Sequence, residues 1–379
     1  TMPVLPDELA GIFDAEEYKK SQLYKRDNTR FSFFSSSLSF VVMLLLFIFG
    51  VFGWYDDLIN GLSKHYIVHV LIFFGTFAIA GDLLTTPFDL YNTFVLEERY
   101  GFNRTTARTF ILDKLKGWLI GVILGGGLLA LVTWIYMLTG KWFWLIALGV
   151  MTLISLFMMM FYSNLIVPLF NRQTPLEEGS LREKIEKFSQ KAGFKLDNIY
   201  VMDGSKRSSK ANAYFTGLGP KKRIVLFDTL IEDLEEEEIV AVLAHEVGHY
   251  KKKHTTTGLI LATLQSAIMF YLFSLFVGAD SFAVALGGSE ASFHLGLIAF
   301  GVLYSPISML TGLASNALSR RNEFQADRFA KQKYEAGSLV SSLKKLSKNN
   351  LSNLTPHPVY VFFHYSHPPL LQRIKALES

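Results

Sequence analysis

Apolar residues along this chain are gathered into six long runs that are separated by polar segments. The runs are free of charged residues or nearly so, and they cover 31–54, 66–88, 115–138, 142–170, 256–279 and 292–319. A helix needs about 20 apolar residues to cross roughly 30 Å of hydrocarbon, so each run is long enough to span a bilayer. The pattern predicts a mostly α, multi-pass helical membrane protein with six visible spans.

The composition agrees with this pattern. Half of the 379 residues are hydrophobic and 33 are phenylalanine, which is too apolar for an ordinary soluble protein of this size. The net charge is only +4, and no basic run is interleaved with aromatic residues, so we expect no nucleic-acid partner. The chain has no cysteine, which excludes disulfides, thiolate metal ligands and cysteine nucleophiles.

Lysine and arginine are distributed unevenly between the polar segments. In the loops 54–65, 139–141 and 280–291 the only basic residues of this kind are Lys64 and Lys141. The basic segments should therefore face the cytoplasm, in a bacterial plasma membrane or an ER membrane. This predicts a cytoplasmic lead-in (1–30), spans one to four with a cytoplasmic loop at 89–114 (31–170), a catalytic domain (171–255), spans five and six (256–319), and a cytoplasmic C-terminal part of that domain (320–379).

Two details qualify this topology. The polar start of the chain contains no signal peptide, and Thr1-Met2 suggests a processed or trimmed N-terminus. Asp82, Ser315 and Asn316 fall inside apolar runs. Because polar groups are costly in lipid, we expect them to face protein or water, or to lie near a membrane boundary.

The long polar segment 171–255 shows mixed secondary-structure signals. Leu181–Ala192 has helical spacing. Three short apolar runs, Asn198–Met202, Ala213–Thr216 and Arg223–Phe227, predict strands, and Gly217, Gly219 and Pro220 predict a turn that pairs the last two. Beyond them, Asp233 is expected to cap a helix that opens with four glutamates and ends at Lys251–Lys253 and His254.

That helix contains the motif His245-Glu246-Val247-Gly248-His249 in its second half. Positions four apart lie on one helical face, so both imidazoles can reach one metal ion. Glu246 is then placed to take a proton from a water activated by that metal, which is the zincin pattern. The alternative is a surface helix with two structural histidines.

A catalytic zinc ion usually has three protein ligands, and without cysteine the third must be His, Glu or Asp. The best candidate is Glu323, with Asp327 one turn later as an acceptor that orients a ligand histidine. Alternatively, both carboxylates pair with neighbouring arginines on a helix surface. His367, before two prolines, could point inward, although by itself it is more typical of a structural residue.

Together these stretches resemble the type I CAAX prenyl endopeptidases. The resemblance rests on HEVGHYKKKH and SRRNEFQADRFA, with support from Phe94–Thr105, Asn212–Gly217 and Ser366–Arg373, and it covers nearly the whole chain. It implies a cytosolic-side zinc domain and a chamber enclosed by seven spanning helices, of which the first would precede residue 1.

The resemblance also implies roles for individual residues. His245, His249 and Glu323 match the ligands of one zinc ion, and Glu246 matches the catalytic glutamate. His367 and Arg373 match residues near the catalytic centre, where they could stabilise an oxyanion. A strand made of Asn212, Ala213, Tyr214 and Phe215 matches one side of the substrate cleft, where a peptide would add by β-augmentation. That strand could equally be part of a plain hairpin core.

The expected function is hydrolysis of peptide bonds near the C-terminus of prenylated peptides or proteins at a lipid bilayer. Two alternatives stay open at this point. One is a metalloprotease that cuts misfolded membrane proteins, although such proteases are usually shorter. The other is a transporter or lipid-binding protein with a structural metal site, in which Asp82 and Asn316 would be the functional residues.

Overall fold

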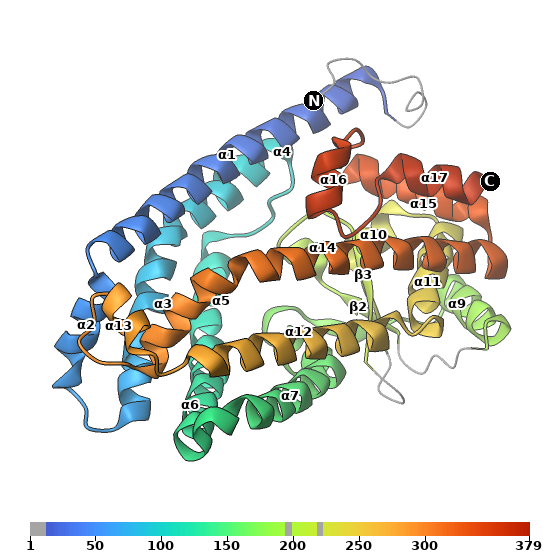
Figure 1. The fold of residues 1–379 in the computed structure, drawn as a ribbon. Helices are drawn as coiled ribbons and strands as arrows, with labels where there is room; N and C mark the ends of the chain where they lie inside the picture. The colour runs from blue at the N-terminus through green and yellow to red at the C-terminus, as the bar shows by residue number, and fades with distance from the viewer. Residues whose placement is uncertain (1–12, 194–198, 218–222) are drawn as a thin grey trace.

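The computed structural model describes residues 13–193, 199–217 and 223–379. Long helices form most of it, and a small sheet lies beside them (Figure 1). The helices of the first half are α1 (Ala15–Ile48), α2 (Val51–Asn60), α3 (Tyr66–Tyr91), α4 (Glu98–Tyr100), α5 (Ala107–Ile120), α6 (Gly127–Thr139), α7 (Phe143–Leu165) and α8 (Val167–Phe170). Those of the second half are α9 (Ser180–Lys191), α10 (Asp228–Asp233), α11 (Glu236–Lys251), α12 (His254–Phe276), α13 (Asp280–Ala285), α14 (Phe293–Lys333), α15 (Ala336–Asn349), α16 (Pro358–His364) and α17 (Leu370–Glu378).

Each of the six predicted spans lies mainly in helix, although the first, 31–54, crosses a turn at Phe49–Gly50 between α1 and α2. Five helical stretches of the described chain are long and apolar enough to cross a membrane, and one of them, Ala107–Phe170, extends over 64 residues. That stretch is interrupted at Gly140, whose φ of 52° is left-handed, so it contains two of the predicted spans, in α5–α6 and in α7. Many large apolar side chains of these helices are exposed, as expected for surfaces that contact lipid.

The polar residues inside the spans are paired with protein groups. Asp82 on α3 accepts hydrogen bonds from Lys114 Nζ at 2.7 Å and from Trp118 Nε1 at 3.0 Å. Ser315 Oγ accepts a bond from Gln265 on α12, and Asn316 Nδ2 donates to the Phe363 carbonyl of α16. They therefore face neighbouring segments of the chain, as expected where unpaired polar groups are costly.

A four-stranded sheet lies beside the helices, in the strand order β1-β2-β4-β3. The predicted strands are present as β2 (Ile199–Met202), β3 (Ala213–Thr216) and β4 (Arg223–Phe227), with β3 and β4 antiparallel. Asn198, Gly219 and Pro220 lie outside the described residues. The sequence interpretation missed β1 (Gln173–Pro175), a three-residue strand that is recognisable only from its antiparallel pairing with β2.

Helix α11 carries the HEVGH motif as predicted, but it begins later than expected. Asp233 ends the short helix α10, and the cap is Glu235, whose side chain forms a reciprocal capping box with Glu238. Glu238 is buried and also accepts hydrogen bonds from Ser341 and Lys345 of α15. The tertiary contacts of Glu238 therefore help to place the start of α11. The prediction was also wrong for His254, which begins α12 after Lys253 turns the chain with φ 59°.

Helix α14 is one of the candidate membrane spans, and its C-terminal part extends beside the four-stranded sheet, where it packs closely on α11 (Figure 1). Gly248 makes this approach possible, because a Cβ there would lie 3.0 Å from the Cα of Ala326 and 3.2 Å from the Cβ of Phe329. The motif's glycine therefore serves packing. It brings the α14 carboxylates up to the α11 histidines.

Candidate metal centre

Two helices bring three metal-ligating side chains to one point. His245 and His249 come from one face of α11, and their Nε2 atoms lie 3.1 Å apart. Glu323 on α14 places Oε1 3.2 Å from His249 Nε2 and Oε2 3.4 Å from His245 Nε2. One ligand atom from each residue lies within 4.8 Å of the other two. Two imidazoles and a carboxylate are one of the usual donor sets of catalytic zinc.

The residues present fit a metal ion. Glu323 is 4% exposed, and its Oε2 is a buried atom that accepts no hydrogen bond from the described residues. A buried carboxylate oxygen without such a bond is costly unless a cation satisfies it. The geometry therefore suits a divalent ion better than a purely hydrogen-bonded cluster.

A further layer of contacts orients His245. Asp327 Oδ1 lies 2.8 Å from His245 Nδ1, so the carboxylate fixes the ring with Nε2 turned toward Glu323. Arg373 on α17 holds Asp327 by two bonds, from Nε at 2.8 Å and Nη2 at 2.6 Å. Glu323 and Asp327 are therefore not paired with neighbouring arginines on a helix surface. Arg320 instead donates to the Tyr365 carbonyl of the chain that follows α16.

The carboxylates make this site attractive to positive charge. Burial alone would lower the pKa of His245, but the neighbouring carboxylates of Asp327 and Glu323 outweigh burial and raise that pKa to about 9. Burial would likewise lower the pKa of Arg373, and Asp327 more than reverses this and raises it. The same negative field that holds a proton on His245 would favour a divalent cation between the three donors.

A cavity of about 740 Å³ opens beside these donors. Glu246 lines it, and so does His367, whose Nε2 lies 3.4 Å from Glu323 Oε1 and whose side chain is 65% exposed. Arg373 also lines the cavity, but Asp327 already occupies two of its nitrogens. The structure thus brings both C-terminal candidates to the centre, where His367 is the more open to a ligand.

The predicted cleft strand forms one wall of this cavity, which Asn212, Ala213, Tyr214 and Phe215 all line. Within the described sheet, β3 is an edge strand that pairs only with β4. Its side chains are partly engaged elsewhere. Tyr214 Oη lies 3.3 Å from both Ser163 Oγ and Gln173 Nε2, and the Phe215 ring packs on Tyr250. The backbone edge, more than the aromatic side chains, suits a peptide.

Comparison with known proteins matches two family models that together cover almost the whole chain. Residues 1–172 match "CAAX prenyl protease N-terminal, five membrane helices", and residues 175–379 match "Peptidase family M48". The chain belongs to peptidase family M48, among the CAAX prenyl proteases. It is therefore a multi-pass membrane metalloendopeptidase, and the family implies a bound metal.

Curated relatives match over about nine tenths of their own length. The CAAX prenyl protease 1 homolog of Arabidopsis thaliana is 37% identical, over 100% of this chain and 91% of its own. The Homo sapiens homolog is 35% identical, over 99% and 89%. The crystal structure of S. mikatae Ste24p superposes with a TM-score of 0.94 at 33% identity, over 100% of this chain and 92% of that one. These matches favour the M48 peptidase interpretation over a transporter.

Sequence reasoning missed one neighbour of the M48 centre. His254 Nδ1 lies 3.0 Å from His249 Nδ1, and its Nε2 lies 3.2 Å from Gln325 Oε1. The link through Gln325 orients His249 much as Asp327 orients His245. His254 is five positions after His249, which is no helical repeat, and the left-handed turn at Lys253 brings the two rings together.

Proposed function

We propose that this M48 peptidase cleaves peptide bonds near the C-terminus of prenylated proteins, with its site at the cytoplasmic face of an ER or bacterial plasma membrane. The basic segments, which include both parts of the proposed catalytic domain (171–255 and 320–379), support this orientation. Spans then occupy 31–170 and 256–319, with the loop 89–114 on the cytoplasmic side and 1–30 as a lead-in. The seven-helix chamber stays a prediction.

The observation that carries the proposal is the lining of the cavity. The metal-ligand candidates and Glu246 line it, and so do side chains of α12 and α14, both apolar (Leu261, Ala262 and Leu318) and polar (Gln265 and Ser315). These two helices are among the candidate membrane spans. A substrate with a polar peptide part and an apolar lipid tail fits such a cavity, because its lining offers both polar and apolar side chains.

We assign the metal as zinc, held by His245, His249 and Glu323. When bound, it supplies a Lewis acid that polarises the scissile carbonyl and lowers the pKa of a coordinated water to about 7. Asp327 keeps His245 in the tautomer that presents Nε2. Arg373 holds Asp327 in place, and its positive charge balances part of the carboxylate charge.

Glu246 is assigned as the general base. It takes a proton as water attacks the carbonyl carbon and then delivers that proton to the leaving amine. His367 is assigned the role of stabilising the oxyanion that forms on the scissile carbonyl. Its side chain is exposed, lines the cavity and lies 3.4 Å from the ligand candidate Glu323. The backbone of β3 aligns the peptide by β-augmentation.

The substrate assignment is tested with a pair of C-a-a-X peptides that differ only in a farnesyl group. We expect the purified chain to cleave the farnesylated peptide with a kcat/KM at least about 10-fold higher, since burying a long apolar tail favours the complex. Mass spectrometry reads the cleavage position, and a sample stripped with a chelator is the control. Equal cleavage of both peptides would show that the enzyme does not select prenyl groups.

The role of the β3 edge is tested at Ala213, whose N–H donates to the side chain of Asn212 and not to β4. Ala213→Pro removes this donor and should leave the pairing with β4 intact. One lost main-chain hydrogen bond costs about 0.5–1.5 kcal/mol, so kcat/KM should fall about 2- to 12-fold, mainly through KM. Ala213→Val keeps the N–H and is the matched control. Identical kinetics for the two variants would refute docking at this amide.

A further inference from the structure

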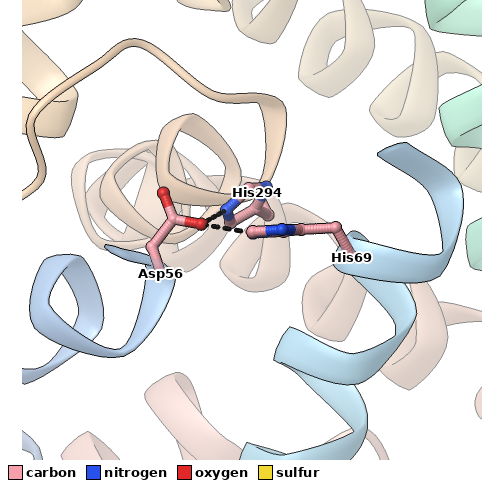
Figure 2. A group of neighbouring side chains, drawn as sticks. All are labelled: Asp56, His69 and His294. Atoms are coloured by element: carbon pink, nitrogen blue, oxygen red, sulfur yellow. Dashed lines mark hydrogen bonds and ion pairs between the residues drawn. The ribbon is translucent and has the colours of Figure 1, made fainter. Parts of the chain in front are cut away.

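A second group of ligand-type side chains lies far from the peptidase centre. Asp56 comes from α2, His69 from α3 and His294 from the first turn of α14, and Figure 2 shows the three side chains converging. Asp56 Oδ1 lies 2.5 Å from His69 Nε2 and 2.6 Å from His294 Nε2. One ligand atom from each residue lies within 4.8 Å of the others. Its donors, two imidazoles and a carboxylate, match those of the peptidase centre.

The two centres lie at opposite ends of α14. His294 and Glu323 are 29 positions apart on this helix (323 minus 294), which corresponds to about 44 Å at 1.5 Å per residue. This exceeds the roughly 30 Å of a hydrocarbon core. The second cluster therefore cannot share a metal ion with the first, and it lies at the Lys/Arg-poor end of the spans.

The cluster is buried and held in a rigid frame. His69 is 7% exposed and His294 is 1% exposed. Gly53, three residues before Asp56, lets the chain at Gly287 cross α2 at close range. A Cβ at Gly53 would lie 2.1 Å from the carbonyl carbon of Gly287. The Gly53 N–H also donates to the Leu286 carbonyl. These contacts hold α2, which carries Asp56, against the chain that leads into α14.

The two histidines converge on a single atom of Asp56. Both Nε2 atoms are hydrogen-bonded to Oδ1, at 2.5 Å for His69 and 2.6 Å for His294, and Ser292 Oγ lies 3.3 Å from His294 Nε2. His294 Nδ1 is buried and has no hydrogen-bond partner among the described residues. Two imidazoles and a carboxylate aimed at one buried point form a donor set that a divalent cation can share when the side chains spread to metal–ligand distances.

We propose that Asp56, His69 and His294 form a second, structural site for a divalent transition metal of the zinc class. An imidazole-rich set with one carboxylate favours zinc and its neighbours over calcium or magnesium, which prefer oxygen. The Asp56 side chain is 14% exposed, which leaves a route for the ion and for a water ligand. Binding would tie α2, α3 and the start of α14 together at the end opposite the peptidase centre.

Metal counting tests the site. The full-length chain is purified in detergent with zinc, desalted, and measured by mass spectrometry for zinc per chain. We expect two equivalents in the wild type and one in Asp56→Asn. Asp57→Asn is the matched control, because Asp57 is the next residue and accepts a hydrogen bond from Ser289 Oγ outside the cluster. We expect it to keep two equivalents. Equal zinc in the two variants would overturn the proposal.

A cobalt titration tests the cluster without altering it. In the double variant His249→Ala/Glu323→Ala two of the three peptidase donors are removed, and we expect one equivalent of Co²⁺ to give visible ligand-field bands. Adding Asp56→Asn should abolish these bands. A double variant that binds no cobalt would refute the second site whatever the stability of Asp56→Asn. Neither readout uses peptide cleavage, so the result is independent of the proposed substrate and of the role of Glu246.

Discussion

Glu246→Gln should lose nearly all peptide hydrolysis while keeping its metal. The amide has almost the same shape as the carboxylate but cannot accept a proton at neutral pH, and general-base catalysis contributes about 10²- to 10⁴-fold. Glu246 lines the cavity beside the three ligand candidates. Removing its charge should therefore lower kcat by about that factor and leave the zinc content unchanged, as read by peptide cleavage and metal analysis on one preparation.

Glu237→Gln is the matched control for this experiment. It lies on the same helix, is exposed, and pairs with Lys184 at a distance from the cavity. The control should keep full activity, because the free energy of an exposed ion pair is small. Substantial activity in Glu246→Gln would rule out the general-base assignment. Loss of metal together with activity would instead make Glu246 part of the metal site.

Glu323→Ala should lower both the bound metal and the activity. Glu323 is the carboxylate donor of the set, and its loss leaves two imidazoles, which are too few to hold a catalytic zinc ion tightly. Activity should fall by at least about 10²-fold at limiting zinc, consistent with the 10- to 100-fold affinity losses seen even for outer contacts of metal sites. Zinc titration monitored by activity and by metal analysis measures the change in affinity.

Excess zinc shows whether the loss of activity in Glu323→Ala follows from the loss of bound metal. If Glu323 acts as a ligand, high zinc should restore part of the activity of Glu323→Ala, whereas it should leave Glu246→Gln inactive. Glu183→Ala, an exposed glutamate on α9, is the control and should bind zinc like the wild type. An unchanged zinc affinity in Glu323→Ala would remove this residue from the ligand set.

Local pattern sufficed for the spans and for the HEVGH helix because both depend on short-range physics. A run of apolar residues long enough to cross hydrocarbon has few alternatives to a helix there. Two histidines four apart share a helical face wherever the helix lies. The errors at Asp233 and His254 arose where local signals competed. The contacts of Glu238 with α15 and the left-handed turn at Lys253 decided those boundaries.

The sequence by itself determined that this is a helical membrane protein with a metallopeptidase motif, and it supplied the ligand candidates. The sequence also predicted that Asp327 orients a ligand histidine. Only the tertiary structure showed that this histidine is His245, that Arg373 holds Asp327, and that His254 reaches His249. The same is true of Asp56, His69 and His294, which come from three separate helices. No periodicity along a chain encodes contacts between residues more than 200 positions apart, because packing of distant helices creates them.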